Sequence, residues 1–322
     1  MMTSVSLVVC TYNRCSILDE TLRSLLEMMI PESLSAEIIV VDNSSSDATA
    51  ETVEKHSRQK AIPVRYVFEP QQGVSYARNA GIHEAKGDLI CFFDDDILAD
   101  PQWLTSMLKL FAETDAVMAG CRILRKWECP VPDWFSEEVG GPLIGQDFGL
   151  VRTNVFRPGQ YLITAALACR RGLFARIGGF REDLGRKGGS LVGGEDKEFF
   201  DRAQDLNESI FYEPDAVIYH RVEPERLTQA YMRRWFSAIG KTAGHQLKRR
   251  FRHTITGAPL WVWRDALSAL LRTLRARVGP VTKAEKVASE MQLRYAANTL
   301  GECLIHAMPE CWASSLCVFK RI

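Results

Sequence analysis

Three adjacent carboxylates, Asp94, Asp95 and Asp96, follow the apolar run at residues 89–93. At neutral pH these side chains repel one another unless a cation lies among them, and oxygen-liganded Mg²⁺ or Mn²⁺ is the natural occupant. In an extended segment alternate side chains point the same way, so Asp94 and Asp96 can serve one site while Asp95 faces elsewhere. The triplet therefore predicts a divalent metal site. The alternative is a solvated acidic turn that caps the following helix.

Two polar segments follow other apolar runs, T-Y-N-R at 11–14 and V-D-N-S at 41–44. Their hydroxyl, amide and carboxylate groups are suited to hydrogen-bonding a nucleoside. Asp42 can accept a hydrogen bond from the ring N–H of uracil or thymine. The alternative is that Asn13 and Asp47 only cap the helices that follow them.

Arg78 and His220 extend this set of polar residues. Arg78 falls near the start of a helix-period segment, where it can pair with a diphosphate or with a carboxylate of the acidic triplet. His220 follows a strand-like apolar run and is either a third metal or diphosphate ligand or a structural histidine. On these residues alone, both pairs of alternatives stay open.

Short apolar, β-branched runs alternate with helix-period segments through the first 121 residues. This order predicts the α/β class, with an open, mostly parallel twisted sheet that helices cover on both faces. Ligands then bind at the carboxyl ends of the strands, where the polar segments fall. The strands are predicted at 5–10, 37–41, 64–68, 89–93 and 116–121. The helices are predicted near 16–29, 47–58, 74–85 and 101–113.

The pattern changes after residue 121, because frequent prolines and glycines make 122–160 a loop-rich insertion suited to line a pocket. Further along, the sequence predicts strands at 161–169 and 216–220, a glycine-rich loop at 186–194 and a helix at 195–206. We therefore expect a catalytic domain over 1–225 and a basic, mostly helical region over 226–322.

The chain carries 40 basic and 40 acidic residues and is 46% hydrophobic, which excludes disordered and collagen-like structure. Residues 221–322 hold 18 basic and 7 acidic residues, so the basic charge is concentrated there. The nine cysteines form no C-x-x-C pair, which indicates thiols in a reducing compartment. No signal-peptide pattern and no apolar run of roughly 18 residues occurs. We expect a cytoplasmic protein, soluble or peripheral on the inner face of the membrane.

The basic region also predicts an amphipathic helix. Its apolar stripe follows helical spacing at Leu260, Trp263, Leu267, Leu270, Leu271, Leu274 and Val278, with Arg264, Arg272 and Arg275 off that line. With the basic run at 248–252, this pattern fits attachment of 245–278 to an anionic membrane surface. The alternative is a helix that packs its apolar stripe on the catalytic domain.

Taken in order, these segments resemble the family 2 glycosyltransferases of the GT-A fold. In that family T-Y-N-R-like, V-D-x-S-like, A-R-N-like and D-x-D segments hold a nucleotide-sugar, and here they fall at 11–14, 41–44, 77–79 and 94–96. The resemblance covers roughly 4–225 and includes G-G-F at 178–180 and G-E-D at 194–196. Asn43 departs from the Asp-Gly-Ser sequence often found in the second segment.

The resemblance implies roles for particular residues. Asp96 would be the principal metal ligand, and Asp94 would meet the ribose or the metal region. Asp196 would be the catalytic base, and Glu195 is the reserve candidate because adjacent helical residues diverge by about 100°. The predicted nucleotide-binding set is Thr11, Tyr12, Asn13, Arg14, Asp42, Asn43, Ser44, Arg78, Asp94 and Asp95.

The implied activity is inverting transfer, with Mn²⁺ or Mg²⁺, from a UDP-, dTDP- or GDP-sugar to a hydroxyl of a glycan or lipid-linked acceptor in cell-surface polysaccharide or glycoconjugate biosynthesis. The alternatives are a nucleotidyltransferase on a similar sheet and a non-catalytic protein that binds nucleotide-sugars or membrane surfaces. The absence of G-x-x-x-x-G-K-[ST] and of G-x-G-x-x-G after the first strand argues against P-loop and dinucleotide enzymes. No nucleic-acid recognition motif accompanies the basic charge, so no nucleic-acid partner is expected.

Overall fold

The computed structural model describes residues 3–58, 62–188, 191, 193–247 and 257–307. The basic run at 248–252 and part of the predicted loop at 186–194 lie outside these residues. The chain divides into two compact units, each described by itself. The first comprises Met1–Glu128, Ile144–Gly189 and Gly194–Val222, and the second comprises Cys129–Leu143, Ser190–Gly193 and Glu223–Ile322.

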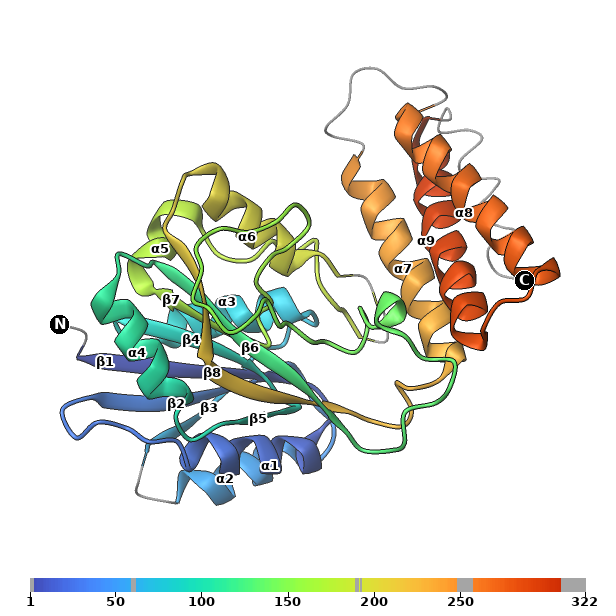
Figure 1. Cartoon of the computed structure of the whole chain (residues 1–322). Helices are drawn as coiled ribbons and strands as arrows, with labels where there is room; N and C mark the ends of the chain where they lie inside the picture. The colour runs from blue at the N-terminus through green and yellow to red at the C-terminus, as the bar shows by residue number, and fades with distance from the viewer. Residues whose placement is uncertain (1–2, 59–61, 189–190, 192, 248–256, 308–322) are drawn as a thin grey trace. The chain divides into compact units, whose positions relative to one another are not determined.

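Among its described residues, the first unit is built on one sheet of eight strands in the order β3-β2-β1-β4-β7-β6-β8-β5 (Figure 1). The strands are β1 (Ser4–Thr11), β2 (Ser35–Asp42), β3 (Val64–Phe68), β4 (Leu89–Asp94), β5 (Ile97–Ala99), β6 (Met118–Trp127), β7 (Ala166–Arg170) and β8 (Ile210–Val222). Four pairings are parallel: β1 with β2 and with β4, β2 with β3, and β6 with β8. β7 is antiparallel to both neighbours and β5 to β8. The predicted α/β class with a mostly parallel sheet is confirmed for the described residues.

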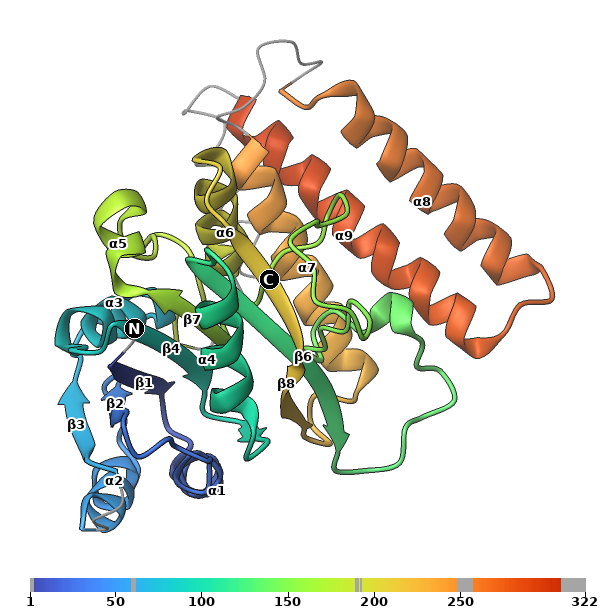
Figure 2. The same ribbon diagram turned by 60° about the vertical axis from the view of Figure 1, so that its left-hand side comes forward.

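Alternating side chains along the strands give the sheet a hydrophobic core on each face. Leu7 of β1 and Phe93 of β4 belong to the core that includes residues of α1 (Cys15–Leu26), α2 (Thr49–Ser57) and α4 (Trp103–Glu113). Their neighbours Val8 and Phe92 belong to the core that includes residues of α3 (Val74–Glu84), α5 (Arg171–Ile177) and α6 (Glu195–Asp205). Helices therefore cover both faces, as Figures 1 and 2 show.

Several elements differ from the sequence prediction. β5 has three residues and α5 has seven, and neither was predicted because so short a segment shows no clear periodicity. The strand expected at 116–121 runs instead over Met118–Trp127, and the one expected at 216–220 is the end of β8. β6 and β8 pair with each other almost throughout, so tertiary pairing extends both beyond their apolar runs. The strand expected at 161–169 is confined to Ala166–Arg170.

The second unit contains the 3-10 helix η1 (Glu137–Val139) and the helices α7 (Gln229–Leu247), α8 (Leu260–Val278) and α9 (Lys283–Ala307). Gly240 and Gly244 let α7 pack closely on α9. A Cβ atom at Gly240 would lie 2.4 Å from the Tyr295 carbonyl oxygen, and one at Gly244 would lie 2.6 Å from the Thr299 carbonyl oxygen. α8 packs on the same helix, with Thr273 Oγ1 donating to the Ser289 carbonyl at 2.9 Å. Among the described residues, no helix is long and apolar enough to span a bilayer.

Candidate active site

The carboxyl ends of β1, β2 and β4 lie side by side, and polar residues stand at each of them. The strand register pairs Thr11 with Asp42 and Cys10 with Asp94. Thr11 and Asp42 are buried, whereas Asp94 is partly exposed. Because parallel strands end at the same edge of a sheet, the first, second and fourth motif segments meet there.

Asp94, Asp96 and His220 form a compact group at this edge, with one ligand atom from each within 4.8 Å of the others. β5 brings the histidine to the aspartates, because Ile97 pairs with His220 directly after Asp96. The Nδ1 atom of His220 lies 3.0 Å from the Arg221 carbonyl oxygen, which can only accept a hydrogen bond. Nδ1 therefore carries a proton, and in a neutral ring the Nε2 atom presents a lone pair.

That Nε2 atom is buried and has no hydrogen-bond partner within the described part of the chain. It lies 3.1 Å from Asp96 Oδ1, so when the imidazole is neutral two atoms that bear lone pairs face each other. A cation would satisfy both, and an imidazole oriented by a carbonyl behind it is a common arrangement for a metal ligand. Two carboxylates and an imidazole suit Mn²⁺ and accept Mg²⁺ less readily. The three side chains therefore fit a divalent metal ion.

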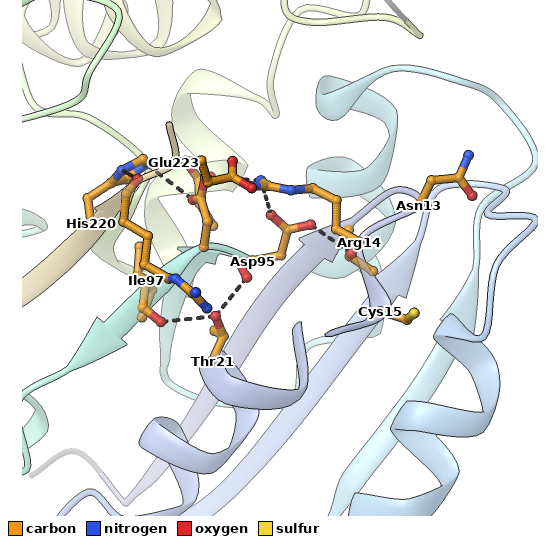
Figure 3. Close-up of polar contacts among 12 residues, drawn as sticks. Asn13, Arg14, Cys15, Thr21, Asp95, Ile97, His220 and Glu223 are labelled. Carbon is orange, nitrogen blue, oxygen red and sulfur yellow. Dashed lines mark hydrogen bonds and ion pairs between the residues drawn. The ribbon is translucent and has the colours of Figure 1, made fainter. Parts of the chain in front are cut away.

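Asp95 is bound by a different set of partners (Figure 3). Its Oδ2 accepts from Thr11 Oγ1 and its Oδ1 from Arg14 Nη1, both at 2.7 Å. Thr21 Oγ1 donates to the backbone carbonyl of Asp95 at 2.7 Å. Arg14 also lies 3.0 Å from Asp96 Oδ2, so one guanidinium joins the two carboxylates. Burial raises the pKa of Asp95 to about 6, although Arg14 acts in the opposite direction.

Arg78 is buried at the centre of a second carboxylate group. Its Nη1 lies 3.0 Å from Glu195 Oε1 and 3.3 Å from Asp196 Oδ1, and its Nη2 lies 3.4 Å from Asp94 Oδ1. Burial by itself lowers the pKa of Arg78, but these carboxylates raise it above its ordinary value. Of the two roles left open for Arg78, pairing with carboxylates is the one present here. It connects the acidic triplet with the G-E-D segment.

Asp196 lies in the first turn of α6. Gly194, with φ of 100°, adopts the left-handed conformation that favours glycine and turns the chain into this helix. Thr164 Oγ1 donates to Asp196 Oδ1 at 2.5 Å. Burial and the neighbouring charge of Glu195 raise the pKa of Asp196 to about 7, although Arg78 and Thr164 act to lower it. A carboxylate with a pKa near neutrality is suited to accept a proton.

The loop before the G-E-D segment is anchored on α3. Asn79 Oδ1 accepts from the Phe180 N–H at 2.8 Å, and Asn79 Nδ2 donates to the Phe180 carbonyl at 2.9 Å. Ser75 Oγ donates to the Leu184 carbonyl at 2.9 Å. The A-R-N and G-G-F segments therefore act together, because they fix this loop to the helix that carries Arg78.

Asp42 is oriented by two protein donors. Its Oδ1 accepts from the Ser45 N–H at 2.8 Å and its Oδ2 from the Tyr66 hydroxyl at 2.7 Å. Burial, together with this bond to Asp42, raises the pKa of Tyr66 to about 12. Each carboxylate oxygen keeps a second lone pair, so a further donor can still be accepted.

Asn43 and Asn13 hold the neighbouring loops. Asn43 Nδ2 donates to the Gln71 carbonyl and Asn43 Oδ1 accepts from the Gly73 N–H, both at 2.7 Å. Asn13 Oδ1 accepts from the Ser46 N–H at 2.7 Å, which ties the first polar segment to the second. The side-chain amides of Asn43 and Asn13 therefore bond to the backbone of neighbouring loops, which the sequence motifs did not predict.

Tyr12 and Ser44 do not join either carboxylate group. Tyr12 is 39% exposed, and Ser44 adopts a positive φ of 66°. Asp47 accepts from the N–H groups of Cys15 at 2.9 Å and of Thr49 at 3.1 Å, so it connects the first residues of α1 and α2. Neither Asn13 nor Asp47 is an N-cap residue, because α1 and α2 have Arg14 and Ala48 at those positions.

The sequence reasoning missed Thr164, Tyr66 and Thr21, whose hydroxyls hold site carboxylates or their backbone. Each is one hydroxyl within a mixed or apolar segment. For Thr164 and Tyr66 the available signal was a hydroxyl within a predicted strand, which is common in every sheet. For Thr21 it was a hydroxyl within the helix predicted near 16–29.

Comparisons with solved structures show the same fold. The mannosyltransferase PcManGT from Pyrobaculum calidifontis has a TM-score of 0.63 at 18% identity, covering 92% of this chain and 86% of that one. S. aureus TarS 1-349 in complex with UDP-GlcNAc has a TM-score of 0.50 at 18% identity and covers 90% of each chain. The predicted GT-A fold is confirmed.

The model of glycosyl transferase family 2 matches residues 6–178. The chain therefore belongs to this family and is an enzyme of the glycosyltransferase class. Succinoglycan biosynthesis protein ExoM of Rhizobium meliloti (strain 1021) is 29% identical over 248 residues, 76% of each chain. The glucosyl-dolichyl phosphate glucuronosyltransferase of Haloferax volcanii is 28% identical over 225 residues, 68% of this chain and 69% of that one.

Proposed function

We propose that this enzyme performs inverting, metal-dependent transfer of a sugar from a nucleotide-sugar to an acceptor hydroxyl. The observation that carries the proposal is the position of Arg78, which contacts Asp94 of the metal group and Asp196 of the G-E-D segment. A cation site for the leaving group and a proton acceptor for the nucleophile thus lie at the same end of the sheet. A single displacement at the sugar needs both groups close together.

Asp94, Asp96 and His220 would hold the metal ion, and the buried Nε2 atom of His220, which faces Asp96 Oδ1 without a hydrogen bond among the described residues, supports this assignment. When bound, the ion would neutralise the negative charge that grows on the leaving diphosphate. Arg14, which contacts Asp95 and Asp96, places a second positive charge beside this group. Arg78 would not neutralise the diphosphate, because its guanidinium is already shared among three carboxylates. It would hold the metal group and the base group together.

The donor would be a UDP-, dTDP- or GDP-sugar. The structure of PcManGT is described with GDP-Man and Mn2+ and that of TarS with UDP-GlcNAc, so both purine and pyrimidine donors occur among the structural neighbours. In this chain Thr11, Tyr12 and Arg14 would line the nucleotide pocket with Asp42 and its loop. The bond from Tyr66 fixes the Asp42 carboxylate for a ring N–H, while Asn43 shapes the loop instead of contacting the base.

Asp196 would be the catalytic base. Glu195 would not accept the proton, and its negative charge would only raise the pKa of Asp196. The side chain of Asp196 is 18% exposed against 9% for Glu195, and Thr164 orients it. As the acceptor oxygen attacks the anomeric carbon and the bond to the diphosphate breaks, the hydroxyl proton would move to Asp196. One displacement inverts the anomeric centre, so an α-linked donor gives a β-linked product.

The acceptor would be a glycan or a lipid-linked glycan. The transfer would take place on the cytoplasmic side of the membrane, in the biosynthesis of a cell-surface polysaccharide or glycoconjugate. The names of the two relatives support this range, because one concerns succinoglycan biosynthesis and the other a glucosyl-dolichyl phosphate. Residues 122–127 are the end of β6 and not part of a loop as predicted. We propose 122–160 as the segment for acceptor recognition and 1–225 as the catalytic domain.

The test is a transfer assay with Mn²⁺, the three classes of donor, and oligosaccharide or polyprenyl-phosphate-linked acceptors, with the product analysed by NMR. A β-linked product from an α-linked donor, lost when a chelator is added, is the expected result. An α-linked product would contradict the single displacement, and turnover that persists in the chelator would contradict the role of the metal.

A further inference from the structure

α8 turns its small side chains inward and its large apolar side chains outward. Its buried residues are Val262, Ala269, Thr273 and Ala276. Thr273 anchors this face on the Ser289 carbonyl of α9. Figure 2 shows α8 running along α9. The helix is therefore held by a narrow face of small residues.

The predicted apolar stripe lies on the other side of α8. At about 100° per residue, its members fall within roughly a third of the circumference and opposite the buried face. Their exposure ranges from 36% to 89% for Leu260, Trp263, Leu267, Leu270, Leu271, Leu274 and Val278. In water such a patch is unfavourable, and a patch of this kind marks a surface that binds a partner.

Arginines flank this stripe on both edges. At the same helical spacing, Arg264 and Arg275 fall along one edge and Arg277 along the other, and all three are exposed. The single acidic residue in α8 is Asp265, which pairs with Arg264. A leucine and tryptophan face bordered by arginines is the pattern of a helix that lies in the interface of an anionic bilayer.

A second copy of the chain fits this face less well than lipid does. If two stripes packed together, each arginine-lined edge would meet an arginine-lined edge of the other copy. Like charges at close range oppose such pairing. Anionic headgroups would instead neutralise the arginines while the acyl region takes up the leucines and Trp263.

We propose that the outward face of α8 is a docking surface for an anionic lipid bilayer, on which the helix lies parallel to the membrane plane. The inference specifies the membrane location suggested with the proposed function, but it does not depend on the transfer chemistry. It would bring the enzyme to the surface where a lipid-linked acceptor is held.

The test is flotation of the full-length chain with vesicles, in the absence of donor and acceptor. One set of vesicles contains only phosphatidylcholine, and the other about three parts phosphatidylcholine to one part phosphatidylglycerol. The stripe variant is Leu267→Ser with Leu274→Ser, and the charge variant is Arg264→Gln with Arg275→Gln. The matched control, Met29→Ser with Leu206→Ser, removes apolar side chains that are each 56% exposed in the first unit.

We expect the wild type and the control to float with the anionic vesicles and not with the neutral ones. Partitioning should fall at least about tenfold in the stripe variant and about tenfold in the charge variant. Unchanged circular dichroism and thermal midpoint would establish that the variants fold. The proposal is overturned if the wild type stays in solution with both vesicles, if the stripe variant floats like the wild type, or if the stripe substitutions instead dissociate a dimer of the chain.

Discussion

Each carboxylate group at the edge of the sheet has an arginine beside it, with Arg14 3.0 Å from Asp96 and Arg78 3.3 Å from Asp196. The two groups differ in the other side chain that faces the carboxylate. In the metal group, Asp96 faces the lone pair of His220 Nε2, a buried atom without a hydrogen-bond partner among the residues described. In the base group, Asp196 instead accepts a hydrogen bond from the Thr164 hydroxyl. The same type of side chain is thus prepared for an external cation in one place and for a proton in the other. The elements around each group, and not the carboxylates themselves, make this difference.

The largest effect is expected from Asp196→Asn, which keeps the shape of the side chain and removes the proton acceptor. Transfer should fall by about a thousandfold, while donor binding stays within about twofold. Steady-state kinetics and calorimetric donor binding measure the two quantities.

Asp201→Asn on the same helix is the matched control, since Asp201 pairs with Lys197 on the surface of α6. If Asp196→Asn were as active as this control, Asp196 would not be the proton acceptor.

His220→Asn tests the metal group, because it removes the Nε2 atom and leaves an amide that can still donate toward the Arg221 carbonyl. Calorimetry should show Mn²⁺ binding weakened about 10- to 100-fold. His83→Asn, at a highly exposed histidine, is the control and should bind Mn²⁺ like the wild type. Equal affinity for Mn²⁺ in the two variants would show that His220 is not a metal ligand.

Thr164→Val tests how the hydroxyl of the base group acts on Asp196, because it removes that hydroxyl with little change in side-chain volume. The lost hydrogen bond had lowered the pKa of Asp196, so that pKa should rise. The acid limb of kcat/KM against pH, expected near pH 7 in the wild type, should move to higher pH, with about a tenfold loss at neutral pH. Thr164→Ser should restore the profile. An unshifted limb would show that the hydroxyl has no influence on the base.

A smaller effect concerns stability. The pKa of Asp196 is raised from 3.8 to about 7 in the folded chain, so between these values the folded state binds a proton that the unfolded state releases. This contribution is fully present below about pH 4 and is lost as the pH rises through about 7. Each pKa unit corresponds to about 1.4 kcal/mol.

Asp196→Asn lacks this proton linkage. From about pH 4 to about pH 8 the variant should therefore gain at least about 1 kcal/mol in the free energy of unfolding relative to the wild type. Urea denaturation at several pH values measures this difference, and parallel stability curves would show that the pKa of Asp196 is not raised by folding.

The sequence predicted what depends on local pattern. Apolar runs located most strands and, with them, the edge where Thr11, Asp42 and Asp94 meet. The two-residue period of an extended chain anticipated that Asp94 and Asp96 would share a site and that Asp95 would have other partners.

What could not be predicted depends on contacts between distant segments. Thr164 reaches Asp196 because the chain before β7 lies along β4, where the Asp94 N–H donates to the Ala165 carbonyl at 3.2 Å. No spacing in the sequence encodes that neighbour. For α8 the period revealed the leucine stripe, but a second line of small residues, including Ala269 and Thr273, became the buried face.

The most direct test of the account is calorimetric binding of UDP-, dTDP- and GDP-sugars to the wild type and to Asp96→Ala, with Mn²⁺, with Mg²⁺ and with a chelator. Asp133→Ala, at an exposed aspartate, serves as the control. We predict that one class of donor binds in the presence of metal and that its affinity falls at least about tenfold with the chelator and in Asp96→Ala, but not in the control. Donor binding of equal strength with the chelator and in Asp96→Ala, or no donor binding even with acceptor present, would contradict the assignment of this edge as a metal-dependent nucleotide-sugar site.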